Sequence, residues 1–350
     1  MSDFPRFERD DRVLVVAPHP DDEAIATGGM LQAARAAGAR CRVLVATDGD
    51  NNPWPQRWIE KRWRIDAADR ARWGARRRAE ALAALQVLGA DADSARCLGF
   101  PDLGLTLLLM SGDGRFDAAL TQQFDEVRPT YLFVPALHDR HPDHSALHVA
   151  MCIVMARGGA AIPQLFTFGV HGEAAAPDDV VLALSDAQRD VKREAIMQHA
   201  TQMRLSRRRF LAYATTQERF RRVHLPEIPQ PDHPLHGRID ADGTIEIRID
   251  HARWGRRLRG YSLLLVARGT GGEIQRRRID VLDGKKTELI DTVAGSVCGS
   301  ASVEAVEACT KLTFSVGART SAAWIKLATP LPGLFVLDRA GWQTVDVTPT

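Results

Sequence analysis

The stretch "RVLVVAPHPDDE" at residues 12–23 decides the fold. An apolar, β-branched run is followed at once by His19, Asp21 and Asp22, where an ordinary strand-to-helix turn needs only one polar cap. An imidazole beside carboxylates at the end of a strand indicates a cation site. The competing interpretation is an Asp-capped helix start, because Asp is common at that position.

Short apolar runs recur along the first half of the chain. They occupy residues 12–17, 41–47, 95–100, 131–136 and 164–170, and stretches of helical period separate them. Strand and helix alternating at this spacing predict an α/β domain with a Rossmann-like, mostly parallel sheet covered by helices on both faces. Ligands in such sheets gather at the carboxyl ends of the strands. Both "PHPDDE" (18–23) and "LHDRHPDH" (137–144) follow a predicted strand at that edge.

The second half of the chain has a different residue pattern. A Pro-rich connector, "LPEIPQPDHPLHG", precedes short strand-like runs that are broken by "DG" and "GTGG" turns. This pattern predicts a C-terminal all-β, sandwich-like domain, with a small barrel as the alternative. We therefore expect an α/β domain at residues 1–225 and a β-rich accessory domain at 226–350. Glycan binding, an extension of the active-site rim and self-association all stay open for the accessory domain.

The composition limits the classes of protein to which the chain can belong. The 350 residues are 45% hydrophobic, as in globular proteins, and the net charge of +2 gives no global case for a nucleic-acid partner. Five cysteines without CxxC spacing indicate reduced thiols. The polar start "MSDFPRFERDD" lacks the features of a signal peptide, and no apolar run reaches the roughly 18 residues of a membrane span. We expect a cytoplasmic protein without a transmembrane segment.

The two polar clusters together suit metal-assisted hydrolysis. His19 and Asp22 are three apart at a helix start and can project toward one point, whereas Asp21 points elsewhere. One imidazole from His141 or His144 would complete a two-His, one-carboxylate set, which is the catalytic pattern for zinc and is also accepted by Fe(II). Bound zinc lowers the pKa of its water to about 7, and a free carboxylate nearby can take the proton. Hydrolysis of an amide fits these parts.

These motifs also carry a resemblance to a known family. "APHPDDE" (17–23) and "HPDH" (141–144) resemble the signature motifs of the PIG-L/LmbE-like deacetylases, zinc enzymes that remove acetyl groups from N-acetylglucosamine-type sugars. Further segments match the family's pattern at "RRAEALAALQVLG" (77–89), "FPDLGL" (100–105) and "KREAIMQHATQ" (192–202). The resemblance covers roughly residues 11–205.

The resemblance implies roles for individual residues at the reacting centre. His19, Asp22 and His144 would bind zinc, and Asp21 would be the general base. His141 would polarise the substrate carbonyl or act as an acid.

Supporting residues follow from the same resemblance. Asp143 would orient His141 through a hydrogen bond, as imidazoles at metal sites usually require. Arg77 and Asp102 would hold sugar hydroxyls. Some family members carry a Tyr where this chain has Asp139. Oxyanion stabilisation would then come from His141, a backbone N–H or the metal alone.

Three other histidines lie near these motifs. His199, in the segment that matches the family, would line the pocket. His138 and His148 flank "HPDH", and a structural role is the simpler interpretation for both.

Residues 51–78 hold four of the seven tryptophans among many arginines. Three interpretations stay open: an amphipathic helix with its tryptophans packed inward, a lid over the sugar site, and a contact with a membrane surface or glycolipid. Basic patches at 204–210, 219–222 and 253–260 could face an anionic acceptor or could be ordinary solvated faces.

The predicted function is zinc-dependent N-deacetylation of an N-acetylglucosamine-type glycoconjugate, whose anionic or lipid-linked character stays open. One alternative is an amidase that cleaves a larger acyl group or a sugar-linked conjugate. Another is a non-catalytic glycan-binding protein, against which Asp21 argues, because a binder has no use for a base beside a metal. Nucleic acid is not an expected partner, a peripheral membrane contact stays open, and the oligomeric state is not predicted.

Overall fold

The computed structural model describes residues 2–157, 161–172, 178–254, 260–280, 286–316, 319–328 and 336–348. The chain forms two compact units that interleave in sequence. Unit 1 contains Met1–Leu105, Ala118–Ala136 and Gly158–Val223, and unit 2 contains Thr106–Asp117, Leu137–Arg157 and His224–Thr350. The domain boundary expected after residue 225 stays a prediction.

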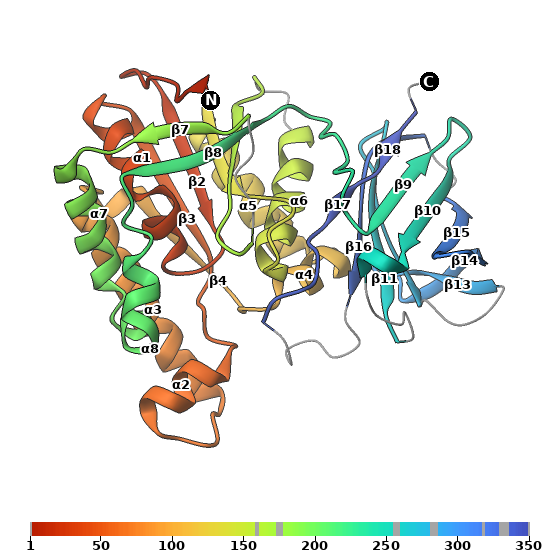
Figure 1. Ribbon diagram of the computed structural model, residues 1–350, viewed down its shortest axis with the longest axis horizontal. Helices are drawn as coiled ribbons and strands as arrows, with labels where there is room; N and C mark the ends of the chain where they lie inside the picture. Colours follow the sequence, from red (N-terminus) through yellow and green to blue (C-terminus); the bar gives the residue numbers. More distant parts are fainter. Residues whose placement is uncertain are drawn as a thin grey trace. The chain divides into compact units, whose positions relative to one another are not determined.

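The sheet of unit 1 is rich in parallel pairs, as the sequence predicts (Figure 1). In spatial order its strands are β1 (Ser2–Asp3), β7 (Val180–Ala183), β8 (Gln217–Val223), β6 (Gln164–Phe168), β5 (Tyr131–Pro135), β2 (Arg12–Ala17), β3 (Arg40–Thr47) and β4 (Ala95–Phe100). The five strands from β6 to β4 are parallel to their neighbours, and β8 runs antiparallel to both β6 and β7. The carboxyl ends of β2, β3 and β5 therefore lie at the same edge.

Burial explains why these strands could be found in the sequence. Residues 13–17 of β2 and all five residues of β5 are buried. Strands buried on both faces have near-continuous apolar sequences. Phe133 and Phe166 stack at 5.2 Å between ring centroids inside this core.

The helices begin and end as follows. They are α1 (Asp22–Ala36), α2 (Pro53–Glu60), α3 (Ala67–Val87), α4 (Leu105–Ser111), α5 (Gly114–Val127), α6 (Pro142–Arg157), α7 (Asp186–Gln198), α8 (Ala200–Leu211) and α9 (His251–Trp254), with a 3-10 turn η1 (Ala92–Ser94). In unit 1, α1, α3 and α7 contact one another on one side of the sheet (Figure 1). Ser185 and Gln188 form a capping box at the start of α7.

A buried ion pair locks α1 against the sheet. The Lys192 ammonium lies 2.6 Å from Glu218 Oε1, and the Glu218 carboxylate also accepts hydrogen bonds from the backbone N–H groups of Gly29 and Met30. A side chain at position 29 would collide with Leu184, because a Cβ there would lie 2.4 Å from its Cδ2. This close packing fixes the helix that begins at the first polar cluster.

Unit 2 contains one large, mostly antiparallel sheet. In spatial order its strands are β17 (Gln343–Thr344), β16 (Thr320–Ala328), β11 (Ser262–Gly269), β12 (Ile274–Asp280), β13 (Lys286–Asp291), β14 (Ser296–Val306), β15 (Cys309–Ser315), β10 (Thr244–Asp250), β9 (Leu235–Ile239) and β18 (Asp346–Val347). The two ends approach each other, since β16 contacts β9 and β18. All ten strands described here belong to one hydrogen-bonded sheet, so the two separate sheets of the expected sandwich are not confirmed.

Alternation along β10 shows how this sheet builds its core. Ile245, Ile247 and Ile249 are buried, and the intervening residues are not. This period of two is the signature of a strand with one face on the core.

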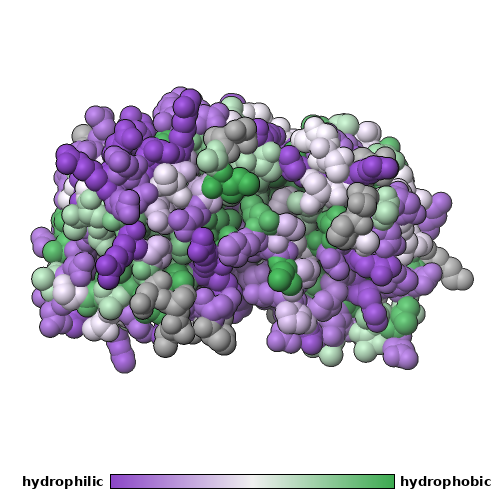
Figure 2. All heavy atoms as spheres, turned by 90° about the horizontal axis from the view of Figure 1, so that it is seen from above, coloured by the Kyte–Doolittle hydropathy of each residue, from purple (hydrophilic) through white to green (hydrophobic). Residues whose placement is uncertain are grey.

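Hydrophilic side chains dominate the face that Figure 2 shows, with hydrophobic side chains scattered among them. Among the described residues, none of the helices combines the length and the apolar character that a membrane crossing requires.

Candidate metal and catalytic site

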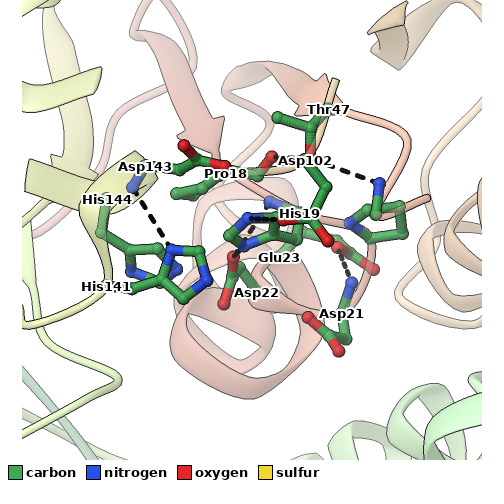
Figure 3. Close-up of polar contacts among 12 residues, drawn as sticks. Pro18, His19, Asp21, Asp22, Glu23, Thr47, Asp102, His141, Asp143 and His144 are labelled. Carbon is green, nitrogen blue, oxygen red and sulfur yellow. Dashed lines mark hydrogen bonds and ion pairs between the residues drawn. The ribbon is translucent and has the colours of Figure 1, made fainter. Parts of the chain in front are cut away.

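The turn between β2 and α1 is held rigidly by the neighbouring strand. Thr47, the last residue of β3, donates from both its backbone N–H and its hydroxyl to the Pro18 carbonyl, each at 2.9 Å (Figure 3). Because this turn spans only residues 18–21, fixing Pro18 restricts where His19 and Asp21 can lie.

His19 lies between two carboxylates. Its backbone N–H donates to Asp22 Oδ2 at 3.0 Å, and its Nδ1 lies 3.2 Å from the same oxygen. Its Nε2 lies 3.1 Å from Oδ1 of Asp102, which follows β4. All three side chains are buried. Burial opposes the charge of Asp102, but the adjacent His19 ring holds the pKa of Asp102 below its usual value.

Asp21 has a strained backbone and a separate partner. Its φ of 128° and ψ of −31° are rare for a residue with a side chain, and such strain clusters at functional sites. Its carboxylate lies 3.2 Å from Arg77 Nη2, whereas that of Asp22 faces His19. Burial raises the pKa of Asp21 to about 6, against the opposing effect of Arg77. The structure thus directs the two neighbouring carboxylates to different partners.

Arg77 ties three segments of unit 1 together. From α3, its guanidinium donates to the Gly49 carbonyl at 3.0 Å and to the Pro20 carbonyl at 2.6 Å, in addition to Asp21. Position 49 must be glycine, because its φ is +62° and a Cβ there would lie 1.8 Å from Arg77 Nη1. Arg77, for which the resemblance implies a sugar contact, therefore holds the general-base candidate and the loop after β3.

A second buried pair supports Asp21 from the other side. Glu23 Oε2 accepts a hydrogen bond from the Asp21 backbone N–H at 2.9 Å, and Glu23 Oε1 lies 2.9 Å from His199 Nε2. Burial opposes a charge on His199, but the Glu23 carboxylate raises the pKa of His199 above its usual value. His199 is therefore linked to the Asp21 backbone through the Glu23 carboxylate.

Two of the segments that resemble the family pattern, residues 77–89 and 192–202, also bind each other. Glu80 of α3 accepts hydrogen bonds from the Thr201 backbone N–H at 3.1 Å and the Thr201 hydroxyl at 2.6 Å. With its amide oxygen turned toward α3, Gln202 accepts from Arg77 Nε at 3.1 Å. These contacts hold the start of α8 against the helix that carries Arg77.

The second cluster lies at the start of α6 in unit 2. Asp139 Oδ1 accepts a hydrogen bond from the His141 backbone N–H at 2.9 Å, and Asp139 Oδ2 lies 3.1 Å from His144 Nδ1. The Asp143 backbone N–H donates to His141 Nδ1 at 3.3 Å (Figure 3). Because Nδ1 of His144 faces Asp139, Nε2 is its candidate metal-binding atom.

Asp139 is a candidate site residue to which the sequence analysis assigns no role beyond its departure from the Tyr of some family members. The sequence does contain a signal for such a partner. Asp139 lies two residues before His141 and five before His144, and imidazoles that bind metals usually have an acidic partner.

His148, one turn further along α6, has a structural partner in Glu227, with which its Nε2 forms an ion pair. This contact agrees with the structural interpretation of His148. Together with Cys152, the two residues also form a group whose atoms could hold a metal ion.

The donor set in unit 1 fits a divalent cation. Two donors at 2.0–2.1 Å from one tetrahedral zinc ion lie about 3.3 Å apart, and His19 Nδ1 lies 3.2 Å from Asp22 Oδ2. His19 and His144 each direct the other ring nitrogen at a carboxylate, from Asp102 and Asp139 respectively. Nitrogen and oxygen donors of this kind suit zinc or Fe(II).

Comparisons with known proteins agree with the motifs. Residues 14–155 match the family model described as PIG-L: GlcNAc-PI de-N-acetylase. The 1D-myo-inositol 2-acetamido-2-deoxy-alpha-D-glucopyranoside deacetylases of Rhodococcus jostii and Mycolicibacterium vanbaalenii are 33% and 31% identical over 171 and 170 residues, 44% of this chain in each case. The alignments cover 56% and 58% of those relatives, so the chain spans little more than half of their length.

One similar solved structure is the N,N'-diacetylchitobiose deacetylase of Pyrococcus horikoshii. It has a TM-score of 0.48 and 19% identity, over 61% of this chain and 84% of that protein. The family match includes both "APHPDDE" and "HPDH". The chain is therefore similar to the PIG-L family through residues 14–155.

Proposed function

We propose that the protein is a metal-dependent hydrolase that removes the acetyl group from an N-acetylated amino sugar of the N-acetylglucosamine type. The observation that carries this proposal is Asp21, a buried carboxylate with a raised pKa, held by Arg77 beside the His19–Asp22 donor pair. Functional sites are where such shifted groups concentrate. The family match and the deacetylase activity for which the relatives are named support the same chemistry.

We propose that His19, Asp22 and His144 bind one cation, with zinc preferred and Fe(II) as the alternative. The topology supports this grouping, because β5 pairs with β2 in parallel and His141 follows Pro135 at the end of β5 by only six residues. When bound, the cation supplies a water of lowered pKa and polarises the amide carbonyl.

Different residues of the chain carry out the individual proton transfers. Asp21 accepts the proton of the attacking water at a carboxylate oxygen, as a positioned carboxylate can. Arg77 holds that carboxylate in place, and Glu23, which pairs with His199, holds the Asp21 backbone N–H. His141, with Asp143 beside it, polarises the carbonyl or protonates the departing amine. Acetate and a free amino sugar are the products.

The contacts in unit 1 support positioning roles for two residues to which the resemblance assigns sugar contacts. Asp102 orients His19, and Arg77 orients Asp21. Either residue could still reach a sugar hydroxyl when substrate binds.

Acetate release from a panel of N-acetylglucosamine derivatives tests the proposal. We expect turnover by the zinc-loaded protein, and a loss of roughly 10²–10⁴-fold in kcat for Asp21→Asn at unchanged metal content, since a general base contributes about that much. Asp125→Asn, an exposed carboxylate on α5, is the matched control and should retain activity.

Two outcomes would contradict the proposal. One is full activity in Asp21→Asn, which would show that Asp21 is not the general base. The other is a metal-loaded protein that releases no acetate from any acceptor. Measuring longer carboxylic acids in the same assay identifies an amidase that acts on larger acyl groups.

A further inference from the structure

The tryptophans between β3 and α3 project outward. Trp54, Trp58 and Trp63 are 56%, 77% and 78% exposed, whereas Trp73 of α3 is only 1% exposed. The interpretation with tryptophans packed inward is therefore wrong for three of these four residues. Three large apolar side chains on one short segment are unusual for a surface without a partner.

Helix α2 is held in place by polar contacts and does not use these indoles for packing. Gln56 is buried, and its amide donates to the Asp69 carbonyl at 2.9 Å and to Glu60 Oε2 at 3.1 Å. Asn52 caps the helix by accepting a hydrogen bond from the Trp54 backbone N–H. The helix therefore presents its tryptophans from a fixed scaffold.

A guanidinium links the indoles. The Arg57 guanidinium carbon lies 5.0 Å from the ring centre of Trp54 and 5.6 Å from that of Trp63, both within cation–π range. Lys61 and Arg64 beside them are exposed. The side chain of Arg57 thus covers faces of two rings that a stacked sugar would need.

Helix α8 adds positive charge to the same region. It contacts α2, although about 140 residues separate them in the sequence (Figure 1). It exposes Arg204, Arg207, Arg208 and Arg209. We call the exposed tryptophans of residues 54–63 and these four arginines the Trp–Arg surface.

The acidic residues in the described contacts of α2 already have arginine partners. Glu60, the last residue of α2, pairs with Arg72, and Asp69, whose carbonyl binds Gln56, pairs with Arg62. The whole chain has a net charge of only +2, so the positive charge is a local property of the surface.

We propose that the Trp–Arg surface docks the protein onto an anionic lipid bilayer. Indole rings favour the headgroup region of a membrane, and clustered arginines are attracted to anionic lipids. A lid for a neutral sugar would explain the tryptophans but would not account for the exposed arginines of α8. The proposal concerns a binding surface outside the hydrolytic centre and stands apart from the proposed function.

Co-sedimentation of the full chain with vesicles tests this docking. We expect binding to phosphatidylcholine vesicles that contain about one-third phosphatidylglycerol, little binding to pure phosphatidylcholine, and release by about 0.5 M NaCl because salt screens the attraction. The triple variant Trp54→Ala, Trp58→Ala, Trp63→Ala and the double variant Arg208→Gln, Arg209→Gln should each weaken binding at least roughly tenfold.

Matched controls keep charge and hydrophobicity comparable. The triple variant Leu107→Ala, Ile162→Ala, Ile228→Ala removes apolar side chains that are 72%, 81% and 88% exposed outside the surface. The double variant Arg40→Gln, Arg96→Gln removes exposed charges at the opposite, amino edge of the sheet. Both controls should bind vesicles like the wild type.

Three results would overturn the proposal: no vesicle binding by the wild type, equal losses in the control variants, or binding that is insensitive to phosphatidylglycerol. Tryptophans and arginines also bind single-stranded nucleic acid. Tight binding of a single-stranded oligonucleotide without vesicle binding would assign the surface to that partner instead. Thermal unfolding of each variant excludes misfolding as the cause of a loss.

Discussion

Two neighbouring segments leave the same edge of one sheet, but one buries its characteristic side chains and the other exposes them. The turn after β2 buries its charged side chains and gives each a partner, as with His19 between Asp22 and Asp102. The segment after β3 exposes three tryptophans. The first arrangement suits chemistry that needs fixed geometry and little water, and the second suits a partner that arrives from outside.

Arg77 is where the two segments meet, because its guanidinium binds both the Pro20 carbonyl before α1 and the Gly49 carbonyl after β3. The energetic consequences differ sharply between them. Removing one member of a buried charged pair leaves the other unpaired in a poor solvent, whereas an exposed side chain can be removed with little change in folding. Substitutions should therefore separate the two segments by the size of their effects.

The largest expected effect on stability is that of Arg77→Met. It leaves the Asp21 carboxylate and two carbonyl groups without their buried donor, so we expect a loss of about 3–5 kcal/mol in the free energy of unfolding. Arg78→Met is the adjacent control, because Arg78 is partly exposed and pairs with Asp48 near the surface. Its loss should be at most about 1 kcal/mol. Similar losses in urea-induced unfolding for both variants would contradict the buried-anchor role of Arg77.

A smaller effect is expected on metal affinity when Asp139 becomes Asn. Asp139 fixes the Nδ1 side of His144, and removing such a partner typically lowers metal affinity about 10–100-fold. Titration against a chromophoric chelator measures this loss. Asp113→Asn, which changes an aspartate paired with exposed Arg115, should leave the affinity unchanged.

The equivalent change at Asp102 separates two roles. If Asp102 orients His19, Asp102→Asn should weaken metal binding to a similar degree. If its main contact is with sugar, metal affinity should stay intact and KM for the sugar should rise. The first result would show that both imidazoles depend on a carboxylate partner.

The sequence predicts the strands and the motif residues of the buried region well. Residues 12–17 and 131–135 are recognisable because strands buried on both faces are apolar throughout. Motif spacing identifies His19, Asp21 and Asp22, although which partner each contacts depends on segments far along the chain. Arg77 and His199 illustrate this, since the resemblance assigns them to the pocket but not to Asp21 and Glu23.

The exposed region and unit 2 were harder to predict for related reasons. Hydrophobicity alone does not distinguish buried Trp73 from exposed Trp58, and nothing local indicates that α2 meets α8. In unit 2 the short strands follow local patterns, but their closure into one sheet depends on pairings between distant residues, such as β9 with β18. Non-local contacts decided both outcomes.

The smallest expected effect is on the folding of the Trp54→Ala, Trp58→Ala, Trp63→Ala variant. Because these indoles are exposed, we expect the free energy of unfolding to stay within about 0.5 kcal/mol of the wild type. Trp73→Ala is the contrasting control, since loss of a fully buried indole should cost about 3–5 kcal/mol. Acetate release from a soluble acceptor should likewise persist in the triple variant. If folding instead weakened as much as in Trp73→Ala, the tryptophans would be part of the core, and the contrast between the buried turn after β2 and the exposed segment after β3 would fail.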